Sequence, residues 1–186
     1  MARQLDPEAT RALLGATLRL LGERGFQGLT MEAVAREARV GKPAIYRRFR
    51  DKAELVAAAL ATALPALDPP DYGDTRRELR EILDAALPAN GVAFVSLAGQ
   101  LLAEHERHPE LIATYRTGVL EPRRRLAMDV IRRGQERGDL RVELDPEVAI
   151  DMATGEFLAR VWGGRPTDDR WRADFFERWW EYVSAR

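Results

Sequence analysis

Six basic side chains fall between Arg39 and Lys52, and a single acid accompanies them. The basic residues are Arg39, Lys42, Arg47, Arg48, Arg50 and Lys52, and the acid is Asp51. Ammonium and guanidinium groups bind phosphate oxygens whatever the base sequence, so the chemistry indicated is the binding of a polyanion. Charge patterning alone is a weak signal, and a solvated charged face is the competing interpretation.

The segment from Lys42 to Phe49 predicts a short amphipathic helix. Ile45 and Phe49 lie four residues apart and therefore share one face of that helix. The opposite face carries Lys42, Tyr46, Arg47 and Arg48. A two-turn helix with an apolar back and a cationic front, which also bears a phenol, fits the major groove of duplex DNA.

The residues before this helix predict a second helix that positions it. Thr30 is suited to cap the first helix, and Glu32 then lies near the positive end of the helix dipole. Pro43 is tolerated in the first turn of the second helix, where a missing amide costs nothing. The stretch from Thr30 to Phe49 therefore predicts two short helices, joined by a tight turn at residues 39–41.

Two histidines, His105 and His108, suggest a different chemistry, because they lie beside Glu104 and Glu106 and three positions apart. Pro109 is expected to end the helix at His108, however, so the two rings need not share a face. The chain contains no cysteine, and we find neither a nucleophile paired with a base nor a glycine loop for phosphate. We expect no enzyme activity, no metal and no cofactor.

Charge is distributed unevenly along the 186 residues, although the formal net charge is only −1. Residues 1–55 carry 11 Lys and Arg against 7 Asp and Glu, whereas the remainder carries 18 against 23. This asymmetry is expected if only the first part meets a polyanion. The sequence shows no apolar run of membrane-spanning length and no signal-peptide segment, so we expect a cytoplasmic protein without a membrane partner.

Helical periodicity runs through the whole chain, and no alternating strand of useful length is present. We predict an all-α fold of about nine helices. The predicted helices cover approximately residues 6–24, 30–38, 42–49, 52–64, 75–87, 92–106, 109–137, 145–163 and 168–184. Gly25 should stop the first, an Asp51–Glu54 capping box should open the fourth, and Pro122 should kink the seventh near Gly118. The sixth is apolar nearly all round and should be buried.

Residues 11–55 resemble the DNA-binding domain of the TetR/AcrR family of bacterial transcriptional regulators. The matching positions are Leu13, Leu14, Ala16, Leu20, Leu21, Glu23, Arg24, Gly25, Phe26, Thr30, Val34, Ala35, Ala38, Val40, Lys42, Tyr46, Phe49, Lys52 and Leu55. The resemblance implies a three-helix helix-turn-helix domain in residues 1–55, followed by a helical effector-binding and dimerisation domain in residues 56–186. It also implies that residues 42–48 form the recognition helix.

The resemblance assigns DNA-binding roles to individual residues. Those at positions that contact the phosphate backbone in the family are Thr30, Lys42, Tyr46 and Arg48, and those at base-reading positions are Pro43, Ala44 and Arg47. Arg39 and Lys52 complete the predicted DNA-binding set. Pro43 and Ala44 could meet a thymine methyl, and Arg47 could bind a guanine edge. A core tyrosine at position 46 and a solvent-facing charge at Arg47 remain alternatives.

The sequence departs from the family pattern at four positions of this region. Arg39 replaces the usual glycine of the turn, Gly41 the usual serine cap, Pro43 a small residue and Arg48 the usual histidine. If Arg39 has a positive φ, its backbone is strained; otherwise the turn differs from that of the family. We expect Arg48 to keep the phosphate role with a permanent charge.

Two adjacent aromatic rows mark the last helix. One row holds Trp171, Phe175, Trp179 and Tyr182, and the other holds Phe176, Trp180 and Val183. A stripe this wide exceeds one partner surface, so we predict that the helices at residues 145–163 and 168–184 form the face of a homodimer. The interface residues that we predict on the last helix are Trp171, Phe175, Phe176, Trp179, Trp180 and Val183. The alternative is that they pack only within their own domain. In the family the last two helices form a four-helix bundle across a two-fold axis, and each subunit reads one half-site.

The helices from Thr75 to Gly163 are expected to surround an apolar cavity. Its predicted lining is Phe94, Leu97, Leu101, Tyr115, Met128, Met152 and Phe157, although each of these residues could equally be ordinary core. By resemblance, such a cavity takes an unidentified small-molecule inducer. We therefore predict a repressor released from a palindromic operator. The alternatives are a regulator without a small-molecule effector, an activator, and a metal-responsive regulator acting through His105 and His108.

Overall fold

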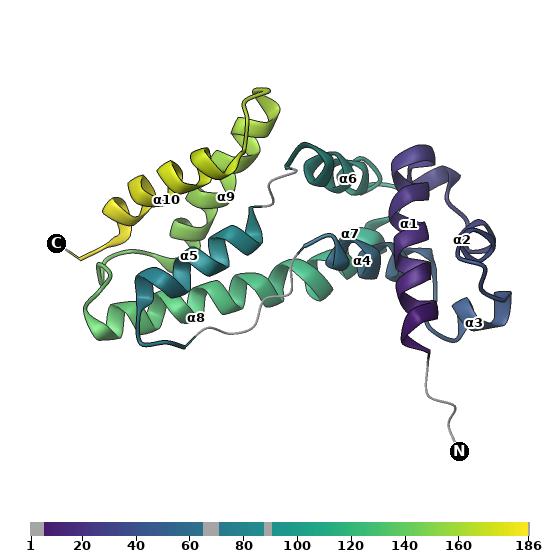
Figure 1. Cartoon of the computed structure of the whole chain (residues 1–186), viewed down its shortest axis with the longest axis horizontal. Coiled ribbons are helices and arrows are strands. Elements are labelled where there is room, and N and C mark those ends of the chain that lie inside the picture. Colours follow the sequence, from purple (N-terminus) through teal and green to yellow (C-terminus); the bar gives the residue numbers. More distant parts are fainter. Residues whose placement is uncertain (1–5, 65–70, 88–90, 186) are drawn as a thin grey trace, which may run out of the picture. The chain divides into compact units, whose positions relative to one another are not determined.

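The structure is a computed structural model that describes residues 6–64, 71–87 and 91–185, with the side chain of Phe94 left out (Figure 1). Within these ranges the regular structure consists of ten α-helices and one π-helical turn, and β-structure is limited to an isolated bridge between Leu140 and Ser184. The all-α prediction is therefore confirmed. The count exceeds nine because the helix predicted for residues 109–137 is divided into α7, a π-turn and α8.

The chain forms two compact units, each assembled from two segments. Unit 1 contains Met1–Ala63 and Ser96–Leu120, and unit 2 contains Leu64–Val95 and Glu121–Arg186. Unit 1 extends past residue 55 because α4 packs against both α1 and α7. The functional boundary at residue 55 stays a prediction, since packing units and functional domains need not coincide.

Unit 1 is built from the N-terminal helices and the segment around α7. Its elements are α1 (Pro7–Gly28), α2 (Met31–Glu37), α3 (Lys42–Tyr46), α4 (Lys52–Thr62), the second half of α6 (Gly91–Ala103), α7 (Pro109–Tyr115) and the π-turn η1 (Arg116–Leu120). Gly25 has a positive φ of 66°, and this breaks the regular geometry of α1 at the predicted stop. Phe26 then turns into the core, where it is 3% exposed.

Side-chain caps fix where the helices of unit 1 begin. Asp51 accepts a hydrogen bond from the Glu54 amide at 2.8 Å, and the Glu54 carboxylate accepts one from the Arg50 amide at 2.7 Å. The predicted cap by Asp51 is therefore confirmed, but the return hydrogen bond of the predicted capping box is not: Glu54 accepts from the amide of Arg50, one residue before the cap, rather than from that of Asp51. The π-turn lies just before Pro122, whose ring would clash with the carbonyl four residues earlier, at Gly118, in a regular helix. The regular helix is therefore interrupted near Gly118, where the kink was predicted, and the interruption is this π-turn.

Unit 2 consists of four long helices and the first turns of α6. The long helices are α5 (Thr75–Ala86), α8 (Glu121–Arg137), α9 (Pro146–Trp162) and α10 (Asp169–Val183). Its core joins side chains from all four helices, among them Leu83, Ile131, Phe157 and Phe176. Close approach of α5 and α8 depends on Gly134, because a Cβ there would lie 2.5 Å from Thr75 Cγ2.

A buried carboxylate is part of the packing between α5 and α8. Glu78 is fully buried; it lies 3.3 Å from Arg133 and 3.3 Å from Arg137, and it accepts a hydrogen bond from the Tyr72 amide at 2.7 Å. Burial alone raises the pKa of Glu78, but these three partners outweigh it and hold the pKa below its ordinary value of 4.5. The carboxylate therefore remains ionised inside unit 2 at neutral pH.

Helix α6 differs from its prediction. Val92 and Leu102 are exposed, so the expectation that this apolar helix is buried all round is wrong. Among the described residues, no single helix combines the length and apolarity that a bilayer crossing requires, and only the bent pair α5 and α6, taken together, would meet that criterion.

Candidate nucleic-acid interface

Helices α2 and α3 form the predicted helix-turn-helix. The Thr30 hydroxyl accepts a hydrogen bond from the Ala33 amide at 3.1 Å, which confirms the predicted cap of α2. Val34 and Ile45 are completely buried, so the apolar backs of the two helices face the core of unit 1. Gly41 begins α3 without a side-chain cap, and α3 is one turn shorter than predicted, continuing as a turn through Arg47 and Arg48.

Arg39 adopts the strained backbone conformation that the sequence raised as one of two possibilities. Its φ is 55°, the one positive φ at a non-glycine position in the described part of the chain. The turn is closed by hydrogen bonds from the Arg39 amide to Arg36 O at 3.1 Å and from the Val40 amide to Ala35 O at 2.8 Å. This is the pattern of a helix C-terminus that glycine normally occupies, so the chain retains the family's turn with a residue poorly suited to it.

The front of α3 presents Lys42 and Tyr46 to solvent. Tyr46 is 49% exposed, so the alternative of a core tyrosine is wrong. Both side chains meet one carboxylate: the Tyr46 hydroxyl donates to Glu32 Oε1 at 3.1 Å, and Lys42 Nζ lies 3.0 Å from the same oxygen. The hydrogen bond and charge of Lys42 hold the pKa of Glu32 below its ordinary value, and Glu32 in turn raises the pKa of Lys42 and Tyr46.

Two further side chains of the predicted DNA-binding set, those of Arg48 and Lys52, bond to α1. The Arg48 guanidinium donates to Thr10 Oγ1 at 3.1 Å, to Ala44 O at 2.8 Å and to Asp6 O at 3.3 Å. Lys52 Nζ donates to Phe26 O at 2.9 Å and lies 4.1 Å from the centre of the Phe26 ring, and burial lowers the pKa of Lys52. Both cations therefore help to hold α3 and α4 against α1.

The three predicted base-reading residues lie in α3 and at its C-terminal end. Pro43 and Arg47 are exposed, and Ala44 is half-buried. Within the described ranges the Arg47 guanidinium forms neither a hydrogen bond nor an ion pair, which leaves all five of its N–H donors available to a ligand. The base-reading roles of these residues remain predictions.

Glu32 is the residue of this surface that the sequence did not reveal as a site residue. Its position in the first turn of α2 suggested only a favourable interaction with the helix dipole. Its approach to α3 depends on how the two helices cross. Glu32 and Lys42 are ten positions apart on different helices, so no spacing within one helix would predict their contact.

Five of the six residues of α10 that were predicted to form an exposed dimer face are core residues of unit 2, so their prediction as an exposed surface is wrong. Trp171, Phe175, Phe176, Trp179 and Val183 are buried, and only Trp180 is half-exposed. The physical reason is that α10 has two neighbours. Trp171 stacks on Phe175 and approaches Phe157 of α9, with ring centres 6.2 Å apart, while Arg80 of α5 lies 5.0 Å from the Phe176 ring.

Exposed apolar side chains lie on α9, the other helix of the predicted dimer face. Val148, Met152, Gly155, Ala159 and Trp162 repeat at intervals of four and three residues and lie opposite the buried face of the helix. Trp162 is 78% exposed, the largest exposed fraction among the large hydrophobic side chains of the described residues. We call these five residues the outer stripe of α9.

The seven residues predicted to line an effector cavity are divided between the two units. Leu97, Leu101 and Tyr115 belong to unit 1, whereas Met128, Met152 and Phe157 belong to unit 2, and the side chain of Phe94 lies outside the described residues. Met152 is 42% exposed, so its placement in an apolar interior is wrong: α9 turns Ala149, Ala153 and Phe157 inward instead. The other residues stay predictions.

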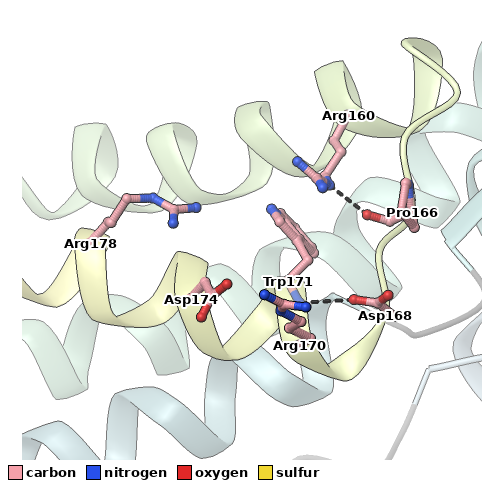
Figure 2. A pocket seen from close by; sticks show the side chains of 7 residues that line it. All are labelled: Arg160, Pro166, Asp168, Arg170, Trp171, Asp174 and Arg178. Atoms are coloured by element: carbon pink, nitrogen blue, oxygen red, sulfur yellow. Dashed lines mark hydrogen bonds between the residues drawn. The ribbon is translucent and has the colours of Figure 1, made fainter.

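The pocket described in unit 2 is polar and shares no residue with that set. It has a volume of about 340 Å³ and is lined by Arg160, Pro166, Asp168, Arg170, Trp171, Asp174 and Arg178. Figure 2 shows Arg160 and Arg178 on either side of the Trp171 indole. Arg160 donates to Pro166 O at 2.5 Å, and Asp168 accepts from the Trp171 amide at 2.9 Å, so these side chains cap and close the turn between α9 and α10.

The two histidines lie in unit 1, and His108 packs edge-on against Phe26 with ring centres 5.1 Å apart. Its Nδ1 atom is 3.1 Å from Glu110 Oε1, and His105 is exposed. Across the described ranges, no group of three or more His, Cys, Asp or Glu side chains is arranged to hold a metal ion.

Family comparisons agree with this architecture over most of the chain. Residues 13–59 match the family of bacterial regulatory proteins known as the tetR family, and residues 69–178 match the tetracyclin repressor-like C-terminal domain. The chain belongs to the TetR family of bacterial transcriptional regulators. It is a DNA-binding transcriptional regulator, and this family is one of regulators rather than enzymes.

Individual relatives cover nearly the whole chain. An uncharacterised HTH-type transcriptional regulator of Bacillus subtilis, YdeS, is 31% identical over 166 residues, which is 86% of this chain and 81% of that protein. The DNA-binding transcriptional repressor TetR of Mycobacteroides abscessus is 28% identical over 160 residues, 85% of this chain and 84% of that protein. The crystal structure of the TetR family regulator SCO0332 superposes with a TM-score of 0.65 at 26% identity, covering 94% of this chain and 97% of that one.

Proposed function

We propose that this regulator is a repressor that binds a palindromic operator as a homodimer and is released by a small, largely apolar ligand. In this proposal residues 1–55 bind DNA and residues 56–186 dimerise and bind the effector. The protein acts on chromosomal DNA in the cytoplasm.

The observation that carries the DNA-binding role is the solvent-facing front of α3. Lys42, Tyr46 and Arg47 are all exposed on a helix whose back, at Ile45, is completely buried. Lys42 and Tyr46 suit phosphate oxygens, and the unengaged guanidinium of Arg47 suits a guanine edge. The Thr30 hydroxyl accepts the cap hydrogen bond and still has its own hydrogen to donate to a phosphate.

The sign of regulation is supported by one relative. The Mycobacteroides abscessus protein is named a transcriptional repressor and aligns with this chain over 160 residues. Repression by operator occupancy also needs no surface for recruiting polymerase. An activator remains the alternative.

The outer stripe of α9 supports a homodimer. Gly155 and Ala159 are small enough for two helices to approach closely, and Val148, Met152 and Trp162 supply apolar area around them. A two-fold axis brings the same stripe of both subunits together, so one helix face supplies both halves of the interface.

The proposed effector is a ligand of residues 56–186. Its basis is the match of residues 69–178 to the repressor-like C-terminal domain. A regulator of the same fold that responds to no small molecule is the alternative. Operator affinity that stays constant across a panel of lipophilic compounds would favour this alternative.

The DNA-binding proposal is tested with duplexes from the region flanking the regulator's own gene. Selection of bound genomic fragments identifies the operator, and fluorescence anisotropy then measures its dissociation constant against salt concentration. Lys42→Ala should weaken binding to operator and unrelated duplex alike and reduce the salt slope by about 0.9 for each phosphate that the variant no longer neutralises. Arg47→Ala should weaken operator binding by roughly five- to a hundredfold while leaving the unrelated duplex less affected.

Two results would contradict the assignment. Wild-type protein that binds no duplex in a salt-dependent manner would refute DNA binding through this surface. A Lys42→Ala variant that loses affinity for the operator alone would refute the phosphate role of Lys42.

A further inference from the structure

Glu32 links the two helices of the interface through the side chains that are expected to meet DNA. Its Oε1 atom accepts the Tyr46 hydroxyl hydrogen at 3.1 Å and lies 3.0 Å from Lys42 Nζ. All three side chains are substantially exposed, so these interactions contribute little to the packing of unit 1. The Glu32 carboxylate instead contacts two donors that the proposed function assigns to phosphate oxygens.

A phosphate oxygen and the Glu32 carboxylate compete for the same hydrogens. A phenol has a single hydrogen to donate, so Tyr46 cannot bond to a phosphate while it bonds to Glu32. An ammonium has three hydrogens, but Lys42 would then bring the phosphate charge close to the carboxylate charge. Glu32 is ionised at neutral pH, because its hydrogen bond with Lys42 holds its pKa below the ordinary value.

We propose that Glu32 is a competing acceptor that engages Lys42 and Tyr46 in the free protein and lowers the affinity for duplex DNA of any sequence. This inference rests on the proposed DNA-binding function of α3. A residue that only oriented Lys42 and Tyr46 would raise the affinity for DNA, whereas a competing acceptor lowers it.

The same helix supplies a matched control. Glu37 lies on α2, is exposed like Glu32, and forms an ion pair with Arg19 of α1 at 3.2 Å. Replacing either glutamate with glutamine removes one negative charge from α2. Only the change at Glu32 replaces the charged acceptor of two donors on α3 with a neutral, weaker one. A comparison of the two variants therefore separates local competition from general charge.

The experiment measures anisotropy of a labelled operator duplex and of an unrelated duplex between 50 and 300 mM salt, concentrations on the order of those at which phosphate binding is usually resolved. Glu32→Gln should tighten binding to both duplexes by roughly three- to tenfold relative to Glu37→Gln. Its log–log salt slope should steepen by about 0.9 for each additional phosphate that the variant neutralises. Melting curves show whether each variant retains its fold.

A double-mutant cycle isolates the interaction with Lys42. In a Lys42→Met background, the tightening caused by Glu32→Gln should shrink by at least about half, because side chains that touch are energetically coupled. Weaker DNA binding by Glu32→Gln, or a change equal to that of Glu37→Gln, would overturn the inference even if the wild-type protein binds its operator. Absence of any salt-dependent binding by the wild type would instead remove the proposed function on which the inference rests.

Discussion

Replacing Arg39 with glycine should stabilise unit 1. Arg39 has a φ of 55°, which places its Cβ too close to the following carbonyl oxygen and costs about 1–2 kcal/mol. Glycine removes this repulsion but gives the unfolded chain more freedom, which offsets roughly 0.5–1 kcal/mol. The expected net stabilisation is about 0.5–1 kcal/mol, equivalent to about 1–4 °C in melting temperature for a chain of this size.

Far-UV circular dichroism is the appropriate assay for Arg39→Gly. All four tryptophans lie between residues 162 and 180, in unit 2, so indole fluorescence reports on the other unit. Arg39→Ala is the matched control, because it removes the same charge and keeps the Cβ atom. Equal stabilisation by alanine would show that charge repulsion, rather than backbone geometry, is relieved, and an unchanged or lower midpoint for glycine would refute the reasoning.

Two further predictions concern unit 2. Glu78→Gln should destabilise the protein by about 3 kcal/mol, because it leaves the guanidiniums of Arg133 and Arg137 without their buried counter-charge. The pKa of Glu78 is lowered on folding, so its contribution to stability is present above pH 4.5 and is lost as the pH falls below that value. The urea concentration at the unfolding midpoint should therefore decrease less steeply with falling pH for Glu78→Gln than for the wild type. Met152→Glu should yield monomers in sedimentation velocity, whereas Val142→Glu, a change at an exposed apolar residue outside α9, should not. A dimeric Met152→Glu protein would place the interface elsewhere.

Local signals account for what the sequence predicted correctly. Thr30 and Asp51 cap their helices through hydrogen bonds that span three residues, and Pro122 distorts the turn that immediately precedes it. Each of these effects acts within about one helical turn, so the residue types reveal it directly. The apolar back of α3 follows from the same kind of spacing.

The predictions that failed required knowledge of how helices pack. The prediction for α10 assumed that the domain covers its aromatic stripe with one neighbouring surface, whereas α5 and α9 both cover it. Trp179 illustrates the error, because its indole N–H donates to Ala149 O of α9 at 3.1 Å and is fully inside unit 2. Met152 failed for the corresponding reason, since the sequence of α9 allows either of two apolar faces to point inward.

The count of basic residues from Arg39 to Lys52 overstates the cations available to DNA, because the structure divides them by partner. Arg48 and Lys52 donate to backbone carbonyls, while Lys42 and Arg50 pair with carboxylates. Only the guanidiniums of Arg39 and Arg47 lack a partner within the described part of the chain. The salt dependence of DNA binding should therefore be shallower than it would be if all six cations bound phosphate. Removal of the Glu32 carboxylate should make this salt dependence steeper.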